Sequence, residues 1–375
     1  IDWLTVREDY PHLQLPRVGK YGRLMHDLLT GEVVNESVTW LKHEGSSASS
    51  LEIRCTGNSV EVSGNPSRFC RPDNLFGYTS IEAAIAVFNK VLDTHGLPRF
   101  SASPEVLHRQ QGSDGERTQL YGDGALITRI DLTYNHVVGQ GNEKAYIRGL
   151  SSQSIANGLI PYLYSNGATV DWRSASSKNG TRNRAYRYDK VYSKEAEMAV
   201  RRKKIKSKLS REELDYYDAV RYFCVKEGVV REEQSRYSRF LKRHGRLGML
   251  GYTRLEDFSP YLGDIQRAVN RLEVSMPAYE NVADELIKAG VCGSMQSANA
   301  TQSYCMQWAY GHPIDRSKSQ YYVHLGRLRK IGIDISVENN VERMPARSTA
   351  GTELIKLRPL AVPDWYVMPE DLTAK

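Results

Sequence analysis

The first 240 residues alternate between polar and apolar positions in many short runs, which is the two-residue period of β-strands. Residues 125–134 are the clearest case, because Ile130 and Leu132 fall on one face while Arg129 and Asp131 fall on the other. The same period predicts further strands at 1–7, 51–55, 59–63, 169–173, 182–192 and 229–237. The turn sequence between 51–55 and 59–63 predicts that these two runs form a hairpin.

A period of 3.6 residues indicates helices in other stretches of the chain. Residues 79–94 begin with a capping box, in which Thr79 or Ser80 is the N-cap and Glu82 follows in the first turn. The helices that we expect are 79–94, 151–158, 193–208, 210–227, 254–273, 281–289, 296–309 and 317–330.

Strands dominate up to about residue 240 and helices dominate beyond it, with the glycine-bearing stretch Gly245–Gly251 between them. At 375 residues the chain is long enough for two domains. We therefore predict an α+β fold. A mixed, mainly antiparallel sheet with flanking helices forms a domain in residues 1–245, and a mainly helical region follows in residues 246–375.

The chain is basic, with 51 Lys and Arg against 44 Asp and Glu and a net charge of +7. This permits a polyanionic partner without requiring one. The basic residues cluster at 178–208 and 231–246, and 23 tyrosines offer rings that could stack on bases. Each feature also has a simpler explanation, namely a solvated charged helix and half-buried tyrosines.

Several classes of protein are disfavoured. The five cysteines include no CxxC pair, which fits a reduced cytosolic protein without a zinc ribbon. No apolar run approaches transmembrane length, so we expect no membrane partner. Walker A and GxGxxG patterns are absent, which argues against nucleotide hydrolysis, and the nine histidines include no His-x-His pair of the kind found in nicking nucleases.

Candidate chemistry concentrates in residues 182–192, where tyrosines alternate with arginines. If this run is a strand, Tyr186, Tyr188 and Lys190 share one face. A tyrosine has an ordinary pKa of about 10, so it needs a nearby cation or metal before it can attack a phosphodiester at neutral pH. Lys190 could supply that charge, as could Arg184 or Arg187. Tyr192 is a second candidate hydroxyl, and the run fits a nucleic-acid-binding strand as well as a catalytic one.

Three carboxylates sit in the middle of separate predicted strands: Glu61, Asp131 and Glu233. Acidic residues are depleted in strands, so each needs a reason. They could meet on one polar face and hold Mg²⁺ or Mn²⁺, or each could pair with a neighbouring cation. For Asp2, in the first predicted strand, we expect only a frayed and solvated chain end.

Short matches in a shared order run almost from end to end of the chain, and together they resemble the replication initiators of filamentous phages, the gene II protein family. The matching residues are Ile1-Asp2, Val60-Glu61-Val62, Asn74-Leu75-Phe76-Gly77, Ile127-Thr128-Arg129-Ile130-Asp131, Tyr188 with Lys190, Gly228-Val229-Val230-Arg231 with Glu233, Arg239-Phe240-Leu241-Lys242 and Pro363-Asp364-Trp365-Tyr366 with Pro369.

The resemblance implies a rolling-circle initiator. Such proteins nick the plus strand of the double-stranded form, keep the 5′ phosphate on a tyrosine, and later cleave again and reseal the displaced strand. The family tyrosine falls on Tyr188, with Lys190 as its charge partner, and the strand acids fall on Glu61, Asp131 and Glu233. The cations expected to contact DNA are Arg182, Arg184, Arg187, Arg201, Arg202, Lys203 and Lys204.

The resemblance also implies partners and a setting. These are the replication origin as single- and double-stranded DNA, a host helicase and polymerase, a homo-oligomer on the origin, Mg²⁺ or Mn²⁺, and the cytoplasm of the bacterial host. Residues 1–245 would nick and transfer the strand, and residues 246–375 would bind the origin or self-associate. Two other functions stay open, a non-enzymatic DNA-binding regulator and a metal-dependent hydrolytic nuclease without a covalent intermediate.

Overall fold

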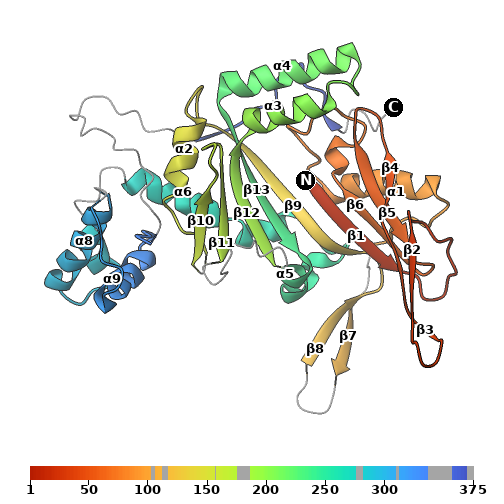
Figure 1. Cartoon of the computed structure of the whole chain (residues 1–375), viewed down its shortest axis with the longest axis horizontal. Helices are drawn as coiled ribbons and strands as arrows, with labels where there is room; N and C mark the ends of the chain where they lie inside the picture. Colours follow the sequence, from red (N-terminus) through yellow and green to blue (C-terminus); the bar gives the residue numbers. More distant parts are fainter. Residues whose placement is uncertain are drawn as a thin grey trace.

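The computed structural model describes residues 1–102, 106–111, 117–156, 158–174, 186–275, 282–309, 312–336 and 357–369. The fold is α+β, as the sequence predicts. Within these ranges ten strands form one sheet in the order β10-β11-β12-β13-β9-β1-β6-β5-β4, and β14 pairs with β9 (Figure 1). Every pairing in this sheet is antiparallel.

The strands of the sheet are β1 (Trp3–Asp9), β4 (Leu41–Glu44), β5 (Ser50–Cys55), β6 (Ser59–Gly64), β9 (Leu126–Val137), β10 (Leu159–Leu163), β11 (Thr169–Ser174), β12 (Arg187–Ser193), β13 (Val229–Tyr237) and β14 (Arg358–Pro359). Two separate hairpins project from the body (Figure 1), formed by β2 (Gly22–His26) with β3 (Val33–Val38) and by β7 (Val106–Gln111) with β8 (Arg117–Gly122).

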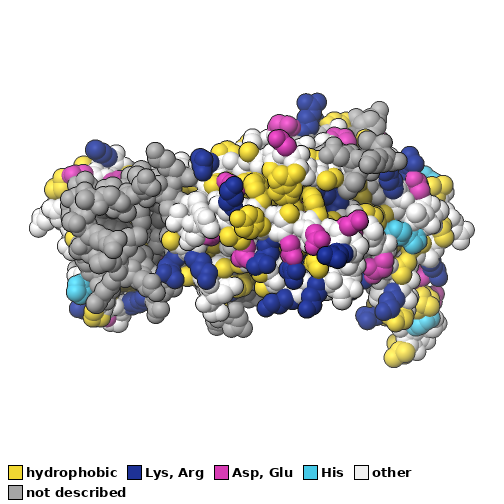
Figure 2. Space-filling view, turned by 90° about the horizontal axis from the view of Figure 1, so that it is seen from above, with side chains coloured by type: hydrophobic (Ala, Val, Ile, Leu, Met, Phe, Trp, Pro, Cys, Tyr) yellow, Lys and Arg dark blue, Asp and Glu magenta, His cyan; other side chains and the backbone are white. Residues whose placement is uncertain are grey.

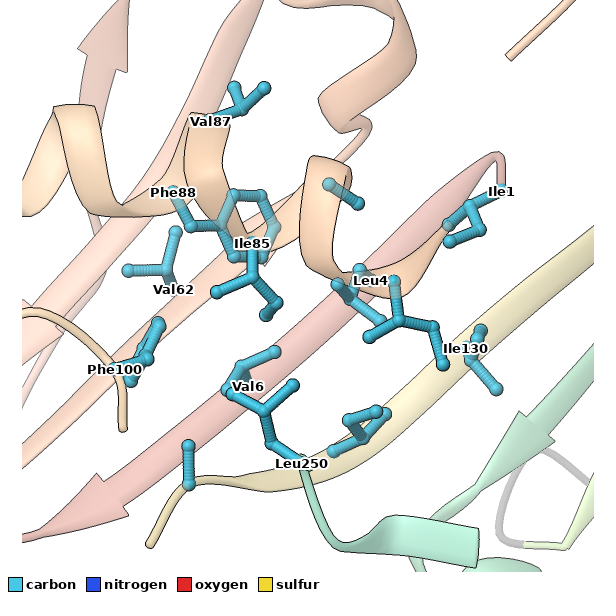
Figure 3. Packing of buried hydrophobic residues seen from close by; sticks show 14 of the residues in the cluster. Ile1, Leu4, Val6, Val62, Ile85, Val87, Phe88, Phe100, Ile130 and Leu250 are labelled. Carbon is cyan, nitrogen blue, oxygen red and sulfur yellow. The ribbon is translucent and has the colours of Figure 1, made fainter. Parts of the chain in front are cut away.

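One face of the sheet is apolar and is covered by helices. The helix α1 (Ile81–Thr94) begins at Ser80, whose hydroxyl accepts the backbone N–H of Ala83 at 3.0 Å. Its buried side chains, among them Ile85 and Phe88, pack on the inward residues of β1 and β6 (Figure 3). Beside it, α2 (Glu143–Leu150) and α6 (Asp264–Ser275) cover the same face over β11, β12 and β13. The opposite face is therefore left for polar chemistry.

A helix pair lies across one end of the sheet. The helix α3 (Lys194–Ile205) follows β12 directly, and α4 (Arg211–Glu227) returns beside it (Figure 1). Ser210 and Glu213 form a complete capping box at the start of α4, and Gly228 ends it in the left-handed conformation at a φ of 65°. The chain then enters β13, whose bounds match the predicted strand 229–237.

Two helix predictions are wrong in detail. The expected helix at 151–158 lies earlier, at α2, because the hydroxyls of Ser151 and Ser152 bond back to the carbonyls of Arg148 and Gly149 at 2.6 and 2.8 Å. The expected single helix at 254–273 is divided into a 3₁₀ turn, Leu255–Tyr261, and α6.

The C-terminal helices α7 (Val282–Lys288), α8 (Met295–Ala309) and α9 (Ser319–Lys330) surround a core of their own, beyond β10 (Figure 1). Residues as far as Val269 belong instead to the cores under the sheet. The tail also returns to the sheet, where β14 pairs with β9 and Tyr366 packs with Leu75 and Tyr217. The division into domains at residue 245 stays a prediction. No helix in the described ranges combines the length and apolar character needed to cross a membrane.

Candidate active site

The register of the sheet brings four of the predicted site residues to its polar face. Residues that lie opposite each other in neighbouring antiparallel strands point to the same side. Tyr188 lies opposite Ser235, which lies opposite Asp131, and Lys190 lies opposite Glu233. The nucleophile candidate, its lysine and two of the acids therefore share one surface.

A cavity of about 730 Å³ opens on this surface. It is bounded by β1, β9, β12 and β13 and by α3. Seen from the side of α3 and α4, Lys and Arg side chains gather over the middle of the molecule, interspersed with acidic ones (Figure 2). The predicted site residues that line the cavity are Asp131, Tyr188, Lys190, Arg201, Lys204 and Glu233.

Tyr188 is held by an acid that the sequence analysis did not single out. The Tyr188 hydroxyl donates a hydrogen bond of 2.7 Å to Oδ2 of Asp171, a fully buried residue of β11. The Tyr164 hydroxyl donates to the same oxygen at 3.1 Å, and the Arg173 Nε donates to Oδ1 at 2.7 Å. The carboxylate is thus fixed from both sides and can accept the phenolic proton. Its position in the middle of a predicted strand, like that of Asp131, was the available signal.

Lys190 lies on Glu233. Its Nζ is 2.9 Å from Oε1 of Glu233 and 5.0 Å from the centre of the Tyr192 ring. Burial works to lower the pKa of Lys190, but Glu233, Asp2 and Asp131 together raise it above its ordinary value. Lys190 therefore keeps its positive charge in the cavity at neutral pH.

Glu233 is an acid whose ionised form is disfavoured by its surroundings. Burial is the main cause that raises its pKa, and the charges of Asp2 and Asp131 raise it further, against the opposing effect of Lys190. The Tyr192 hydroxyl donates to Oε2 of Glu233 at 3.3 Å, and burial followed by Glu233 raises the pKa of Tyr192 well above its ordinary value. Tyr192 is thus far harder to ionise than an exposed tyrosine.

Asp2 is part of the cavity wall, and the expectation of a frayed end is wrong. Its strand, β1, is paired on both sides, with β6 and β9, so the backbone cannot fray. The Asp2 carboxylate accepts hydrogen bonds from Asn65, at 2.9 Å, and from Asn74. Burial would raise its pKa, but Arg231, at 3.5 Å, and Lys194 outweigh that effect and lower the pKa to about 2.

The predicted metal ligands are only partly brought together. Asp131 and Glu233 line the cavity with Asp2, and their oxygens are the donors that Mg²⁺ prefers. Arg129 binds Asp131 at 2.9 Å, however, and in the described ranges no three Asp, Glu, His or Cys side chains are arranged as a ligand set. Glu61 lies on the same face but not on the cavity wall, since Arg54 holds it at 2.8 Å.

The predicted DNA contacts separate into groups. Arg187 points to the opposite face of the sheet, where Asp189 and Asp264 each bind it at 2.6 Å. Arg202 pairs with Asp218, and Lys203 is exposed. Arg201 and Lys204 line the cavity, and Arg182 and Arg184 lie outside the described residues.

The prediction for Tyr186 is wrong. It precedes β12, and its ring packs on Phe240 at a centroid distance of 5.2 Å. The tyrosines that share the polar face with Lys190 are therefore Tyr188 and Tyr192.

Comparison with known proteins assigns the family. The model of the N-terminal part of the phage replication-associated protein of the gene II type matches residues 1–256, and the model of its C-terminal part matches residues 286–372. The chain is similar to the replication-associated protein of this type from Escherichia phage If1, with 38% identity over 328 residues, which cover 86% of this chain and 98% of that protein. No solved structure matches. The chain therefore belongs to the gene II family of phage replication-associated proteins.

Proposed function

We propose that the chain starts rolling-circle replication by nicking the origin of phage double-stranded DNA and forming a 5′-phosphotyrosine link through Tyr188. It later cleaves and reseals the displaced single strand. One observation carries this proposal. The hydroxyl of Tyr188 lies on a cavity wall and donates to the buried Asp171 carboxylate at 2.7 Å, with Lys190 two residues further along the same face.

The chemistry is an exchange of one phosphodiester for another. The phenolic oxygen of Tyr188 forms a bond to phosphorus as its proton passes to Asp171, which acts as general base. The bond from phosphorus to the 3′ oxygen breaks, and that oxygen takes a proton from water and leaves as a 3′ hydroxyl. The bond energy stays in the phosphotyrosine, so resealing by the reverse reaction requires no ATP.

Lys190 stabilises the charge that builds on the phosphoryl oxygens. It is suited to this role because its pKa is raised, by Glu233 above all, despite burial. Glu233 in turn orients the ammonium group through the contact of 2.9 Å.

We propose that Asp131 and Glu233 hold Mg²⁺ or Mn²⁺, with Asp2 as a further oxygen donor beside them. Bound there, the metal would neutralise charge on the phosphate. The mutual repulsion of these acids, seen in the raised pKa of Glu233, favours a cation between them. The metal would compete with Arg129 and Lys190 for the two carboxylates. Glu61 remains a sequence prediction without a contact that supports it.

The remaining partners follow from the same proposal. DNA occupies the cavity as a single strand, a host polymerase extends the 3′ hydroxyl, and a host helicase opens the duplex. The separate core of α7, α8 and α9 supports a distinct task for the C-terminal region, either origin binding or self-association.

The test is a nicking assay on supercoiled phage DNA with Mg²⁺, followed by denaturing electrophoresis. We expect open circles and a protein-linked 5′ end with the wild-type chain, and neither with Tyr188→Phe. Tyr192→Phe is the matched control, and we expect it to retain the adduct. A hydrolytic nuclease would nick without an adduct, and a non-enzymatic regulator would bind without nicking, so either result would overturn the proposal.

A further inference from the structure

Arg201 lies on the α3 wall of the cavity with two unsatisfied donors. Its Nε and Nη2 atoms are buried, and neither has a hydrogen-bond acceptor within the part of the chain that the structure describes. The next residue shows the contrast, because Arg202 donates two hydrogen bonds to Asp218, at 2.6 and 2.5 Å. A buried N–H group without an acceptor is unfavourable, so the site favours a ligand that supplies one.

The surroundings of Arg201 are short of negative charge. Glu197, one turn earlier on α3, gives Oε2 to Nζ of Lys194 at 2.8 Å. Arg68 lines the same cavity and adds a second guanidinium. Burial, and then the charge of Arg68, lower the pKa of Arg201, which is the direction expected for two cations held close together. An anion between them would remove the repulsion and accept the free N–H groups.

These two arginines lie across the cavity from Tyr188. Arg68 ends the 3₁₀ turn Pro66–Arg68, which directly follows β6. In the sheet, β6 is four places from β12, which carries Tyr188. Neighbouring strands are about 4.8 Å apart, so the two backbones are separated by roughly 19 Å. A phosphate held by the arginines is therefore not the phosphate attacked by Tyr188.

We propose that Arg201 and Arg68 bind an uncut phosphodiester of the same DNA strand that Tyr188 cleaves. This inference rests on the proposed function, because it takes the strand in the cavity to be single-stranded DNA. A phosphodiester suits the site because its two free oxygens accept the planar, parallel N–H groups of a guanidinium. Lys204, on the same wall, extends the positive surface. The strand is then held at two points, which fixes its position in front of the tyrosine hydroxyl.

The first experiment measures binding without cleavage. The full chain carrying Tyr188→Phe is titrated with a fluorescent single-stranded oligonucleotide at several salt concentrations. Adding Arg201→Gln should weaken binding about tenfold and reduce the slope of log affinity against log salt by about 0.7, as for the loss of one phosphate contact. Arg202→Gln is the matched control, with less than a twofold effect. Circular dichroism and thermal unfolding verify that the variants fold.

The second experiment locates the phosphate. Single backbone phosphates are replaced in turn by neutral methylphosphonates, with positions counted from the nick mapped with the wild-type chain. We expect one uncut position whose replacement weakens binding to the chain with Arg201 but not to Arg201→Gln. Arg201→Lys keeps the charge without the fork, so it should retain the salt slope and lose most of this position dependence.

The outcomes separate the two proposals. Equal effects of Arg201→Gln and Arg202→Gln, or no position that depends on Arg201, would mean an arginine satisfied by water and would overturn the subsite. Dependence only at the cut phosphate, or competition by inorganic phosphate with no position dependence, would also overturn it. Loss of the covalent adduct from the proposed function would leave these binding results readable, because they are obtained without cleavage.

Discussion

The hydroxyl of Tyr188 donates a hydrogen bond of 2.7 Å to Oδ2 of Asp171, which joins neighbouring strands β12 and β11 through their side chains. Asp171 is fully buried and is also bound by Arg173. The acceptor for the phenolic proton is thus fixed before any substrate arrives, and this arrangement supports the assignment of the nucleophile.

Asp171→Asn should slow formation of the covalent adduct by roughly 10²- to 10⁴-fold, the usual contribution of a general base. Binding of single-stranded DNA should change less than twofold, because Asp171 is buried behind the tyrosine. Single-turnover measurement of the protein–DNA adduct gives the rate. Tyr164→Phe is the control, since it removes the other phenol on the same oxygen, and we expect a small effect. A full rate for Asp171→Asn would mean that another group takes the proton.

Asp131→Asn and Glu233→Gln should each weaken Mn²⁺ binding by at least about tenfold, measured by calorimetry or electron paramagnetic resonance. Both carboxylates line the cavity, whereas Glu61 is held by Arg54 away from it. Glu61→Gln should therefore bind Mn²⁺ nearly as well as the wild type. If Glu61→Gln loses as much affinity as Glu233→Gln, Glu61 belongs to the ligand set. Chelation with EDTA should stop nicking, and added Mg²⁺ should restore it.

Asp2→Asn should lower the free energy of unfolding in a pH-dependent way. The folded pKa of Asp2 is lowered from 3.8 to about 2, so folding favours the ionised carboxylate. Its contribution is complete above pH 3.8 and is lost as the pH falls through about 2. The shift corresponds to about 2 kcal/mol. Denaturant unfolding should show the two proteins differing by this amount at pH 7 and converging toward pH 2. A constant difference at every pH would contradict the lowered pKa.

Arg187→Gln should destabilise the fold without changing DNA binding. Arg187 joins β12 to α6 through Asp264 and also binds Asp189, on the face opposite the cavity. Removal of one partner from a buried ion pair costs about 3 kcal/mol or more. The salt dependence of DNA binding should stay as in the wild type, in contrast to Arg201→Gln. A reduced salt slope for Arg187→Gln would instead restore the sequence prediction that Arg187 contacts DNA.

Local sequence determined the elements and the face on which each side chain lies. The alternation of 229–237 gave β13 with its true bounds, and the capping box at Ser210 marked the start of α4. The period of two also separates Arg187 from Tyr188, since consecutive residues of a strand point to opposite sides. Local patterns are sufficient here because they depend on hydrogen bonds and packing between near neighbours in the chain.

The neighbours of each strand, and therefore the composition of the site, were decided by the tertiary structure. Asp2 reaches the cavity because β1 is inserted between β6 and β9, and Asp171 reaches Tyr188 because β11 pairs with β12. Glu61 has the predicted face but lies in β6, beside Arg54 and outside the cavity. Periodicity fixes the side of the sheet to which a residue points. The distance between two such residues depends on strand order and register, which are set by pairings between segments far apart in the sequence.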